Sequence, residues 1–487
     1  MTLQEGLLDA AAVDLAAAIA GGEIRARAVL DAHLDRITSQ NPAINAVVAR
    51  RFEAARAEAD ALDARIRRDG ARDLPPLAGV PCTIKEFFAV EGMPQTGGLW
   101  SRRNHRAVAD ATVVRRIRDA GAIVLGITNV PEGGLWMETD NRIYGRTNNP
   151  WNTKRTAGGS SGGEGAIVAV GGSAFGIGSD IGGSVRLPAA LCGTVGHKPT
   201  GRLLPNSGQF PAAEGEAGAF LTPGPITRRV RDVLPILRAI AGPDGIDPCC
   251  RDMALGDPSD VDPSSLIVVP VPTVRGLRVS SVMQEAVMAS ARALEKRGAK
   301  IRTASFPDLE NGALVWAAML EELVTEHYDV ILGNDGTGSH PRVDVVRELF
   351  LRLPFGRSHF TFPALAIAFA DNLVQKLPKL GKRFVEQGAR LKARIDEALG
   401  ERGVLLHPPY TRPAPRHMAA MLRPFDPACT AVFNVLEMPG TVVPTGFDSD
   451  GLPIAVQILG MRGGDHVTLA AAQVIEDAFG GWRRATV

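Results

Sequence analysis

Residues 158–184 read GGSSGGEGAIVAVGGSAFGIGSDIGGS. Eleven of these 27 residues are glycine, and each glycine inside a helix costs about 0.5–1 kcal/mol relative to alanine. One regular helix is therefore excluded. We predict two tight turns, one carrying Ser160 and one carrying Ser184, with a short helical segment at 166–170 and a short strand at 174–178 between them.

The turn before Ser184 has the composition of an anion-binding site. Ile181, Gly182 and Gly183 bring little side-chain bulk to it, so successive backbone N–H groups can converge on one point. Acyl transfer needs such donors for its oxyanion, and the loss of one donor typically costs about 2.7–4 kcal/mol. We therefore expect that the N–H groups of Ile181, Gly182, Gly183 and Ser184 can form an oxyanion hole.

Two other interpretations of a glycine and serine cluster are less consistent with the sequence. A phosphate-binding P-loop ends in Gly-Lys-Ser or Gly-Lys-Thr, and no such tripeptide occurs here. A dinucleotide-binding fingerprint requires Gly-x-Gly-x-x-Gly between a strand and a helix, and residues 158–163 lack that order. A flexible loop stays open from composition alone.

A serine nucleophile needs a base, and two residues compete for that role. His197 is near in the chain, but residues 193–200 predict a turn, and chain proximity does not place a catalytic histidine. Lys85 ends the apolar strand pattern of residues 77–85, and burial there would disfavour its charged form. Lys85 is the better candidate. Glu86 would alternate to the opposite face of the strand and need not pair with it.

The full set of motifs resembles the amidase signature family. Its Ser-Ser-Lys triad lies on three strings that stand here at 79–85 (GVPCTIK), 158–163 (GGSSGG) and 180–184 (DIGGS). The family spacing of 24 residues from the first serine of the pair to the nucleophile is met by Ser160 and Ser184. The strings at 144–150 and 196–199 are similar to the fatty acid amide hydrolase branch, in particular its second, vertebrate-type enzyme. Residues of about 250–400 diverge more.

The resemblance implies a role for each matched residue. Ser184 would attack an amide carbonyl, and Ser160, rather than Ser161, would relay the proton to a neutral Lys85. The Gly159–Ser160 peptide bond would be cis. Lowering a lysine pKa from about 10.4 to between 7 and 8 costs roughly 3–5 kcal/mol, which we assign to burial and to the absence of a nearby carboxylate.

The remaining polar residues of the two turns are expected to support them. Asp180 and Arg186 flank the nucleophile turn and would pair to hold it, and Ser161 would hydrogen-bond the turn or fix Ser160. No metal and no other cofactor is expected.

The amino-acid composition of the chain limits the classes of partner and the compartment that we expect for it. A hydrophobic content of 45% with a formal charge of +1 predicts a packed core and no nucleic-acid partner. The five cysteines lack metal-binding spacing, since Cys249 and Cys250 are adjacent, and they predict reduced thiols in a cytoplasmic protein. Residues 1–20 carry spaced acidic residues and predict neither a signal peptide nor a transmembrane segment. A homodimer and peripheral membrane contact stay open.

Periodicity predicts an α/β fold with a mixed, twisted β-sheet covered by helices on both faces. We divide the chain into a helical N-terminal segment at 1–76 and an amidase signature domain at 77–487. That domain would consist of a motif core at 77–245, a variable substrate-shaping insert at about 246–420 and a return to the core at 421–487. The clearest expected elements are helices at 111–119 and 281–298 and strands at 77–85, 122–127, 266–270, 440–445 and 454–459.

Three functions compete. The first is a serine amidase that acts on an acyl amide, including a fatty acid amide, or on an aryl amide. The alternative is the amidase subunit of a tRNA-dependent amidotransferase, and the third is an inactive binding protein, which the retained triad disfavours. Residues 344–374 are rich in apolar side chains and predict either a cap for lipid amides that involves Phe350 and Phe355 or an ordinary pair of core helices.

Overall fold

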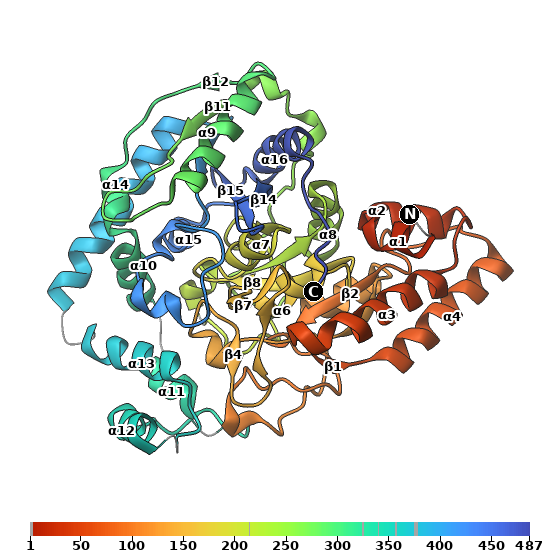
Figure 1. Cartoon of the computed structure of the whole chain (residues 1–487), viewed down its shortest axis with the longest axis horizontal. Helices are drawn as coiled ribbons and strands as arrows, with labels where there is room; N and C mark the ends of the chain where they lie inside the picture. Colours follow the sequence, from red (N-terminus) through yellow and green to blue (C-terminus); the bar gives the residue numbers. More distant parts are fainter. Residues whose placement is uncertain (1–2, 214, 324–325, 339, 356–357, 375–377) are drawn as a thin grey trace.

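A mixed β-sheet of 11 strands runs through the described part of the chain (Figure 1). The structure, a computed structural model, describes residues 3–213, 215–323, 326–338, 340–355, 358–374 and 378–487. The strand order is β1-β3-β2-β8-β10-β9-β14-β15-β13-β11-β12. The strands of this sheet are β1 (Val47–Arg50), β2 (Pro81–Lys85), β3 (Ile123–Thr128), β8 (Phe175–Asp180), β9 (Val195–Lys198), β10 (Thr222–Thr227), β11 (Ile267–Pro270), β12 (Lys300–Ile301), β13 (Gly403–His407), β14 (Gly440–Phe447) and β15 (Pro453–Gly460).

Two small hairpins stand outside the main sheet, and helices flank it (Figure 1). The hairpin strands are β4 (Asp140–Asn141) with β5 (Gly145–Arg146) and β6 (Asn148–Asn149) with β7 (Asn152–Thr156). The described helices are α1 (Leu3–Asp9), α2 (Ala12–Ala20), α3 (Ala26–Ile44), α4 (Phe52–Asp69), α5 (Thr112–Asp119), α6 (Gly162–Ala169), α7 (Arg186–Cys192), α8 (Val233–Ile240), α9 (Ser281–Glu295), α10 (Gly312–Glu321), α11 (Tyr328–Gly333), α12 (Val345–Phe355), α13 (Phe362–Val374), α14 (Pro378–Leu399), α15 (Ala428–Val435) and α16 (Asp465–Phe479). This α/β architecture confirms the predicted fold class, and the helices expected at 111–119 and 281–298 correspond to α5 and α9.

The sheet brings two of the predicted motifs to one edge. Strands β2 and β8 are parallel neighbours, with Ile84 paired with Ile177. Every residue of both strands is buried, as expected for a parallel sheet covered on both faces. Because the carboxyl ends of parallel strands meet at the same edge, Lys85 at the end of β2 lies beside the end of β8.

The helix between the two glycine turns begins earlier than predicted. It was expected at 166–170, but α6 starts at Gly162 and includes three glycines. A Cβ atom on Gly163 would lie 2.5 Å from the backbone nitrogen of Asn129, and one on Gly165 would lie 2.9 Å from Pro188. Close packing, rather than a turn, therefore explains these glycines, and burial of the whole helix outweighs their low helix propensity.

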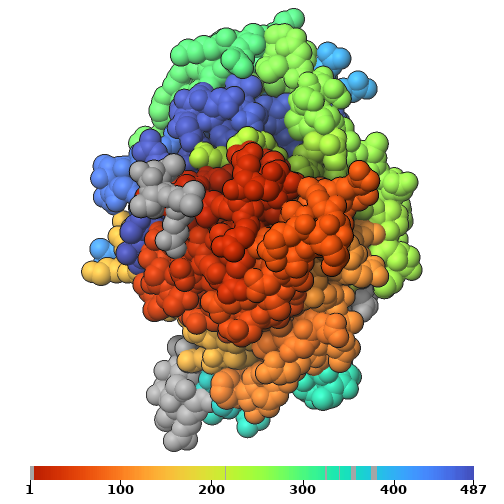
Figure 2. Space-filling model, turned by 90° about the vertical axis from the view of Figure 1, so that its right-hand side faces the viewer, coloured from red at the N-terminus to blue at the C-terminus, as the bar shows by residue number. Residues whose placement is uncertain are grey.

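The N-terminal segment contributes a strand as well as helices. The segment 1–76 was expected to be helical, but Val47–Arg50 form β1, which pairs antiparallel with β3. Asn45 ends α3 in the left-handed conformation at φ 49°, and the β-branched residues that follow favour a strand. The helices of this segment cover the middle of one face of the molecule (Figure 2).

The segment predicted as an insert also joins the main sheet, because it supplies β11, β12 and β13. The division of the chain at residues 76, 245 and 420 stays a prediction. Helices α11, α12 and α13 gather at one side of the molecule, away from α1 to α4 (Figure 1). They pack on the motif core through a small apolar cluster of Leu99, Leu135, Leu332, Val345, Ala364, Leu365 and Ala368.

Candidate active site

Lys85 lies at the centre of a buried polar contact with two serines. Its Nζ donates to Ser160 Oγ at 2.7 Å, to Ser179 Oγ at 3.1 Å and to the carbonyl oxygen of Ser179 at 3.3 Å. The Lys85 side chain is fully buried. The structure thus brings together Lys85 and Ser160, two of the three residues predicted for the triad. It adds Ser179, which the motif comparison did not single out although it directly precedes Asp180.

Burial makes Lys85 an unusual lysine. It lowers the pKa of Lys85 from 10.5 to about 7, while the charges of Asp180 and Glu164 partly counteract this shift. The expectation that Lys85 has no carboxylate nearby is therefore wrong, because two buried carboxyl groups act on it. Burial also raises the pKa of Glu164 to about 8, and Glu164 accepts hydrogen bonds from the hydroxyls of Thr83 and Thr128.

Glu86 points away from this contact, as the strand alternation predicted. It accepts hydrogen bonds from the N–H groups of Thr96, at 2.5 Å, and Gly97, at 2.9 Å. Burial raises the pKa of Glu86 to about 7, against the lowering effect of these donors. Glu86 therefore holds the loop after β2.

The two glycine turns are tied to each other through Ser161. The Ser161 N–H donates to the carbonyl oxygen of Ser184 at 3.1 Å. Its hydroxyl donates to the carbonyl oxygen of Ser179 at 3.3 Å and accepts from the Ser179 N–H at 3.4 Å. The Gly159–Ser160 peptide bond is cis, as the family resemblance implied. These contacts fit the supporting role expected of Ser161.

Asp180 and Arg186 form the predicted pair. The Arg186 Nε donates to Asp180 Oδ2 and its Nη2 donates to Asp180 Oδ1, each at 3.0 Å, and both side chains are fully buried. Burial alone would raise the pKa of Asp180, but the Arg186 guanidinium outweighs it and holds that pKa well below its usual range. Asn434 and Gln457 extend the network by accepting from Arg186 Nη2 and Nη1. Both lie near the end of the chain, and neither was predicted from the sequence.

The nucleophile turn differs from the prediction at one donor. Gly183, at φ 120°, donates its N–H to Asp180 Oδ1 at 2.6 Å. One N–H carries one proton, so the structure argues against Gly183 as an oxyanion donor. Within the described part of the chain the N–H groups of Ile181, Gly182 and Ser184 have no hydrogen-bond acceptor. These three stay predicted donors.

Two side chains from outside the motifs orient this turn. Trp316 of α10 donates its Nε1–H to the carbonyl oxygen of Ile181 at 2.8 Å. Thr430 of α15 donates its hydroxyl to the carbonyl oxygen of Gly182 at 2.9 Å. Each bond fixes the plane of a peptide whose N–H group belongs to the turn. Trp316 lies in the divergent middle of the chain, where no motif could have identified it.

His197 is structural, as expected. It lies in β9, a strand where the sequence predicted a turn. The buried ring contacts Thr441 Oγ1 through Nδ1 at 2.9 Å and Asp465 Oδ1 through Nε2 at 3.1 Å. All five cysteines are buried and free, in line with the expected reduced thiols.

A cavity of about 310 Å³ opens onto Ser160 and Ser184. Its described lining is mostly apolar and includes Phe87, Leu135, Leu221, Trp316, Ile331 and Ile367. Helix α13 thus forms part of the wall, while Phe350 of α12 is 67% exposed and does not line the cavity. Phe350 therefore does not contribute to the cavity wall, because its side of α12 faces outward, and a cap formed by residues 344–374 stays a prediction. The side chain of Phe355 lies outside the described residues.

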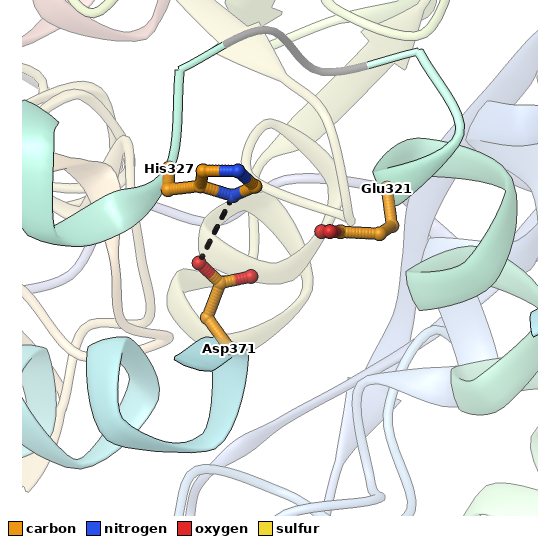
Figure 3. A group of neighbouring side chains, drawn as sticks. All are labelled: Glu321, His327 and Asp371. Atoms are coloured by element: carbon orange, nitrogen blue, oxygen red, sulfur yellow. Dashed lines mark ion pairs between the residues drawn. The ribbon is translucent and has the colours of Figure 1, made fainter. Parts of the chain in front are cut away.

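One cluster of metal-binding residue types occurs among the described residues, and the sequence did not predict it. Glu321, His327 and Asp371 offer donor atoms that lie within 4.8 Å of one another (Figure 3). All three line the cavity that holds Ser184.

The described helices include none that is long and apolar enough to span a bilayer. A cytoplasmic location stays a prediction.

The fold, the three motif strings and the buried lysine define an amide-hydrolysing enzyme. The chain matches the Amidase family over residues 28–469 and belongs to that family, which confirms the resemblance seen in the sequence. It is 36% identical to fatty-acid amide hydrolase 2 of Homo sapiens, over 98% of this chain and 90% of that protein. A glutamyl-tRNA(Gln) amidotransferase subunit of Roseiflexus sp. (strain RS-1) is 32% identical, over 94% of this chain and 93% of that protein. A solved structure of a bacterial aryl acylamidase of the amidase signature enzymes is similar with a TM-score of 0.80 and 25% identity, over 96% of both chains.

Proposed function

We propose that this amidase cleaves a carboxylic amide to an acid and an amine or ammonia through an acyl-enzyme on Ser184. Ser160 and Lys85 would move the proton. The proposal rests above all on the buried 2.7 Å contact between Lys85 Nζ and Ser160 Oγ beside a cavity lined by Ser160 and Ser184. A lysine with a pKa of about 7 is neutral in about half of the molecules at pH 7, as a general base requires.

In the first half of the reaction, a proton moves from Ser184 toward Lys85 while an electron pair moves onto the carbonyl oxygen of the amide. The Ser184 oxygen bonds to the amide carbon while its proton passes to Ser160 and the Ser160 proton passes to neutral Lys85. The carbonyl electrons move onto the oxygen, which the N–H groups of Ile181, Gly182 and Ser184 would stabilise. Collapse of this intermediate breaks the carbon–nitrogen bond, and the leaving nitrogen takes the proton back along the same route.

Water completes the cycle. It gives a proton to the same relay, attacks the acyl-enzyme carbonyl and releases the acid, while Ser184 regains its proton. No step needs a cofactor, because Lys85 and the two serines carry every proton that moves.

The substrate class follows from the cavity. Its volume of about 310 Å³ is at the lower end of small-molecule sites, which hold about 300–1,000 Å³. Its apolar lining would take a short or medium acyl chain or an aryl group. Similarity to fatty-acid amide hydrolase 2 over nearly the whole chain supports the acyl amide, and similarity to an aryl acylamidase supports the aryl amide.

Exposed apolar side chains on helices α12 and α13 support contact with a membrane surface. Val346 and Phe350 of α12 and Phe369 and Leu373 of α13 are exposed apolar side chains on helices beside the cavity wall. Binding to vesicles should fall when Val346 and Phe350 are both replaced by serine, while turnover of a short anilide stays unchanged. Equal binding by the two proteins would argue against the surface.

A second candidate is the amidase subunit of an amidotransferase, favoured by the 32% identity to such a protein over most of both chains. The two candidates differ in partner dependence. The purified chain alone should release acid and amine from acyl or aryl amides, with Ser184→Ala inactive and folded. If the chain acts only on glutamine and only with an added partner, the second candidate is correct.

The decisive experiment is a substrate panel. Alkanoyl anilides, benzoyl amides and the corresponding esters are incubated with the purified chain, and mass spectrometry identifies the products. Hydrolysis of at least one amide that disappears in both Ser184→Ala and Lys85→Ala supports the proposal. Unchanged hydrolysis in Lys85→Ala would contradict the assigned base.

A further inference from the structure

The cavity that holds the catalytic serines has an acidic wall. Among its described lining residues, Glu321, Glu326 and Asp371 carry carboxylates, and His327 carries the one basic side chain. No lysine or arginine is found among the described lining residues. The rest of the described lining is mostly apolar. A charged group on a bound ligand would therefore find its electrostatic partners at this wall.

Three of these residues converge from separate elements. Glu321 is the last residue of α10, His327 directly precedes α11, and Asp371 lies in α13. Figure 3 shows the imidazole of His327 facing the Asp371 carboxylate, with the Glu321 carboxylate directed toward the same space. His327 Nδ1 lies 3.7 Å from Asp371 Oδ2. The Tyr328 N–H, which also donates to Asp371 Oδ2, helps to hold that carboxylate in place.

Two carboxylates held close together favour a bound cation. Partial burial and the neighbouring Asp371 raise the pKa of Glu321, the direction expected for a like-charged pair. Glu326 is different, because its carboxylate is 44% exposed and pairs with His340 at 3.7 Å. Solvent screens such a pair, so Glu326 serves as the natural comparison.

The spacing decides which cation fits. Two ligands of a tetrahedral zinc ion, at 2.0–2.1 Å from the metal, stand about 3.3 Å apart. Acceptors around an ammonium nitrogen, at about 2.8 Å, stand up to about 4.6 Å apart. The 3.7 Å between His327 Nδ1 and Asp371 Oδ2 exceeds the zinc value, and the donor atoms of the cluster lie within 4.8 Å of one another, a span that an ammonium nitrogen can bridge. The location of the cluster also favours an ammonium group, since a substrate that reaches Ser184 occupies this cavity.

We propose that Glu321 and Asp371, with His327, bind a protonated primary amine at the end of the substrate distant from the scissile bond. This inference rests on the proposed function, because it names the substrate class of that site. The substrate would be an amide with an apolar spacer that ends in an ammonium group. The ammonium hydrogens would be donated to the two carboxylates, beside the His327 ring.

The test compares substrates that differ only at that end. In the first series, ω-aminoalkanoyl anilides are paired with alkanoyl anilides in which a methyl group replaces the ammonium, and the spacer is lengthened one methylene at a time. A second series places the same groups on the amine side, as N-(ω-aminoalkyl)benzamides and N-alkylbenzamides. The wild-type enzyme should favour the ammonium member of one series by at least about tenfold in kcat/KM at one spacer length, since a hydrogen bond to a charged group contributes that much.

The variants locate the effect. Glu321→Gln and Asp371→Asn should each remove most of the ammonium preference and leave kcat/KM for the methyl analogue within about twofold. Glu326→Gln, which alters a carboxylate of the same cavity outside the cluster, should keep the preference. Equal rates for both members at every spacer length in both series would overturn the proposal, as would equal losses for both members in Glu321→Gln. Binding of zinc by the cluster without any ammonium preference would also overturn it.

A failure of the proposed function gives a different result. If neither series is hydrolysed, the chemistry assigned to Ser184 is wrong, and calorimetry with the Ser184→Ala protein then tests the ammonium site alone. Tighter binding of the ammonium member, lost in the Ser184→Ala/Glu321→Gln protein, supports the site. Equal binding of the two members overturns it.

Discussion

The lowered pKa of Lys85 predicts the pH dependence of the reaction. Burial brings this pKa from 10.5 to about 7, and the base must be neutral to accept a proton. The neutral fraction is then about one tenth at pH 6, about half at pH 7 and about nine tenths at pH 8. With an ordinary lysine, about three molecules in ten thousand would be neutral at pH 7, and the rate would rise about tenfold per pH unit up to pH 10.

The assay is kcat/KM for a neutral anilide between pH 5.5 and 9.5. We expect the rate to fall at low pH with an inflection near 7 and to reach a plateau above about pH 8. Glu164→Gln should shift the inflection only slightly, because a Glu164 pKa of about 8 leaves this side chain mostly neutral at the pH where Lys85 titrates.

Glu86 provides the matched control for this prediction. Its own pKa is about 7, but it contacts Thr96 and Gly97 rather than Lys85. Glu86→Gln should therefore leave the inflection in place. A rate that is flat from pH 6 to 8, or one that still climbs tenfold per unit above pH 9, would refute the assignment of Lys85 as the base.

Three further predictions concern the turn and the cavity. Trp316→Phe keeps an aromatic ring but removes the hydrogen bond to the Ile181 carbonyl. Because such a bond contributes about 1 kcal/mol, kcat should fall about fivefold with KM little changed. A change in KM alone would contradict this role. Arg186→Gln leaves Asp180 buried without its charge partner, which should cost about 3–5 kcal/mol of stability and lower the melting temperature strongly, whereas an unchanged melting temperature would show that the pair is not structural. For alkanoyl anilides, each buried methylene contributes about 0.8 kcal/mol, so kcat/KM should climb about fourfold per methylene until the cavity is full. Ile367→Ala should shift that limit to a longer chain. A profile that falls from acetyl onward would exclude an apolar acyl site.

The chemistry of the site could be predicted because it is encoded in short strings. Lys85 and Asp180 end strands, and Ser160 lies in the turn just before α6, so that glycine or an apolar run marks each boundary locally. Parallel pairing of β2 and β8 then brings those ends together. The sequence therefore sufficed to name these residues, and the α/β fold followed from the alternation of strands and helices.

Contacts between distant segments could not be predicted in this way. Trp316 and Thr430 orient the nucleophile turn from far along the chain, 135 residues from Ile181 and 248 residues from Gly182. Nothing in their local sequence marks them. The use of the Gly183 N–H by Asp180 depends on side-chain geometry within one turn. Apolar pattern alone was also insufficient for Phe350, because a helix that lines a cavity and a helix that faces solvent can carry the same residues.

Covalent labelling can show directly whether Ser184 is the nucleophile. A fluorophosphonate is incubated with the purified chain, and peptide mass spectrometry locates the adduct. We expect one adduct on Ser184, formed more slowly in Lys85→Ala and absent in Ser184→Ala. An adduct on Ser160, Ser161 or Ser179, with Ser184 unmodified, would contradict this expectation.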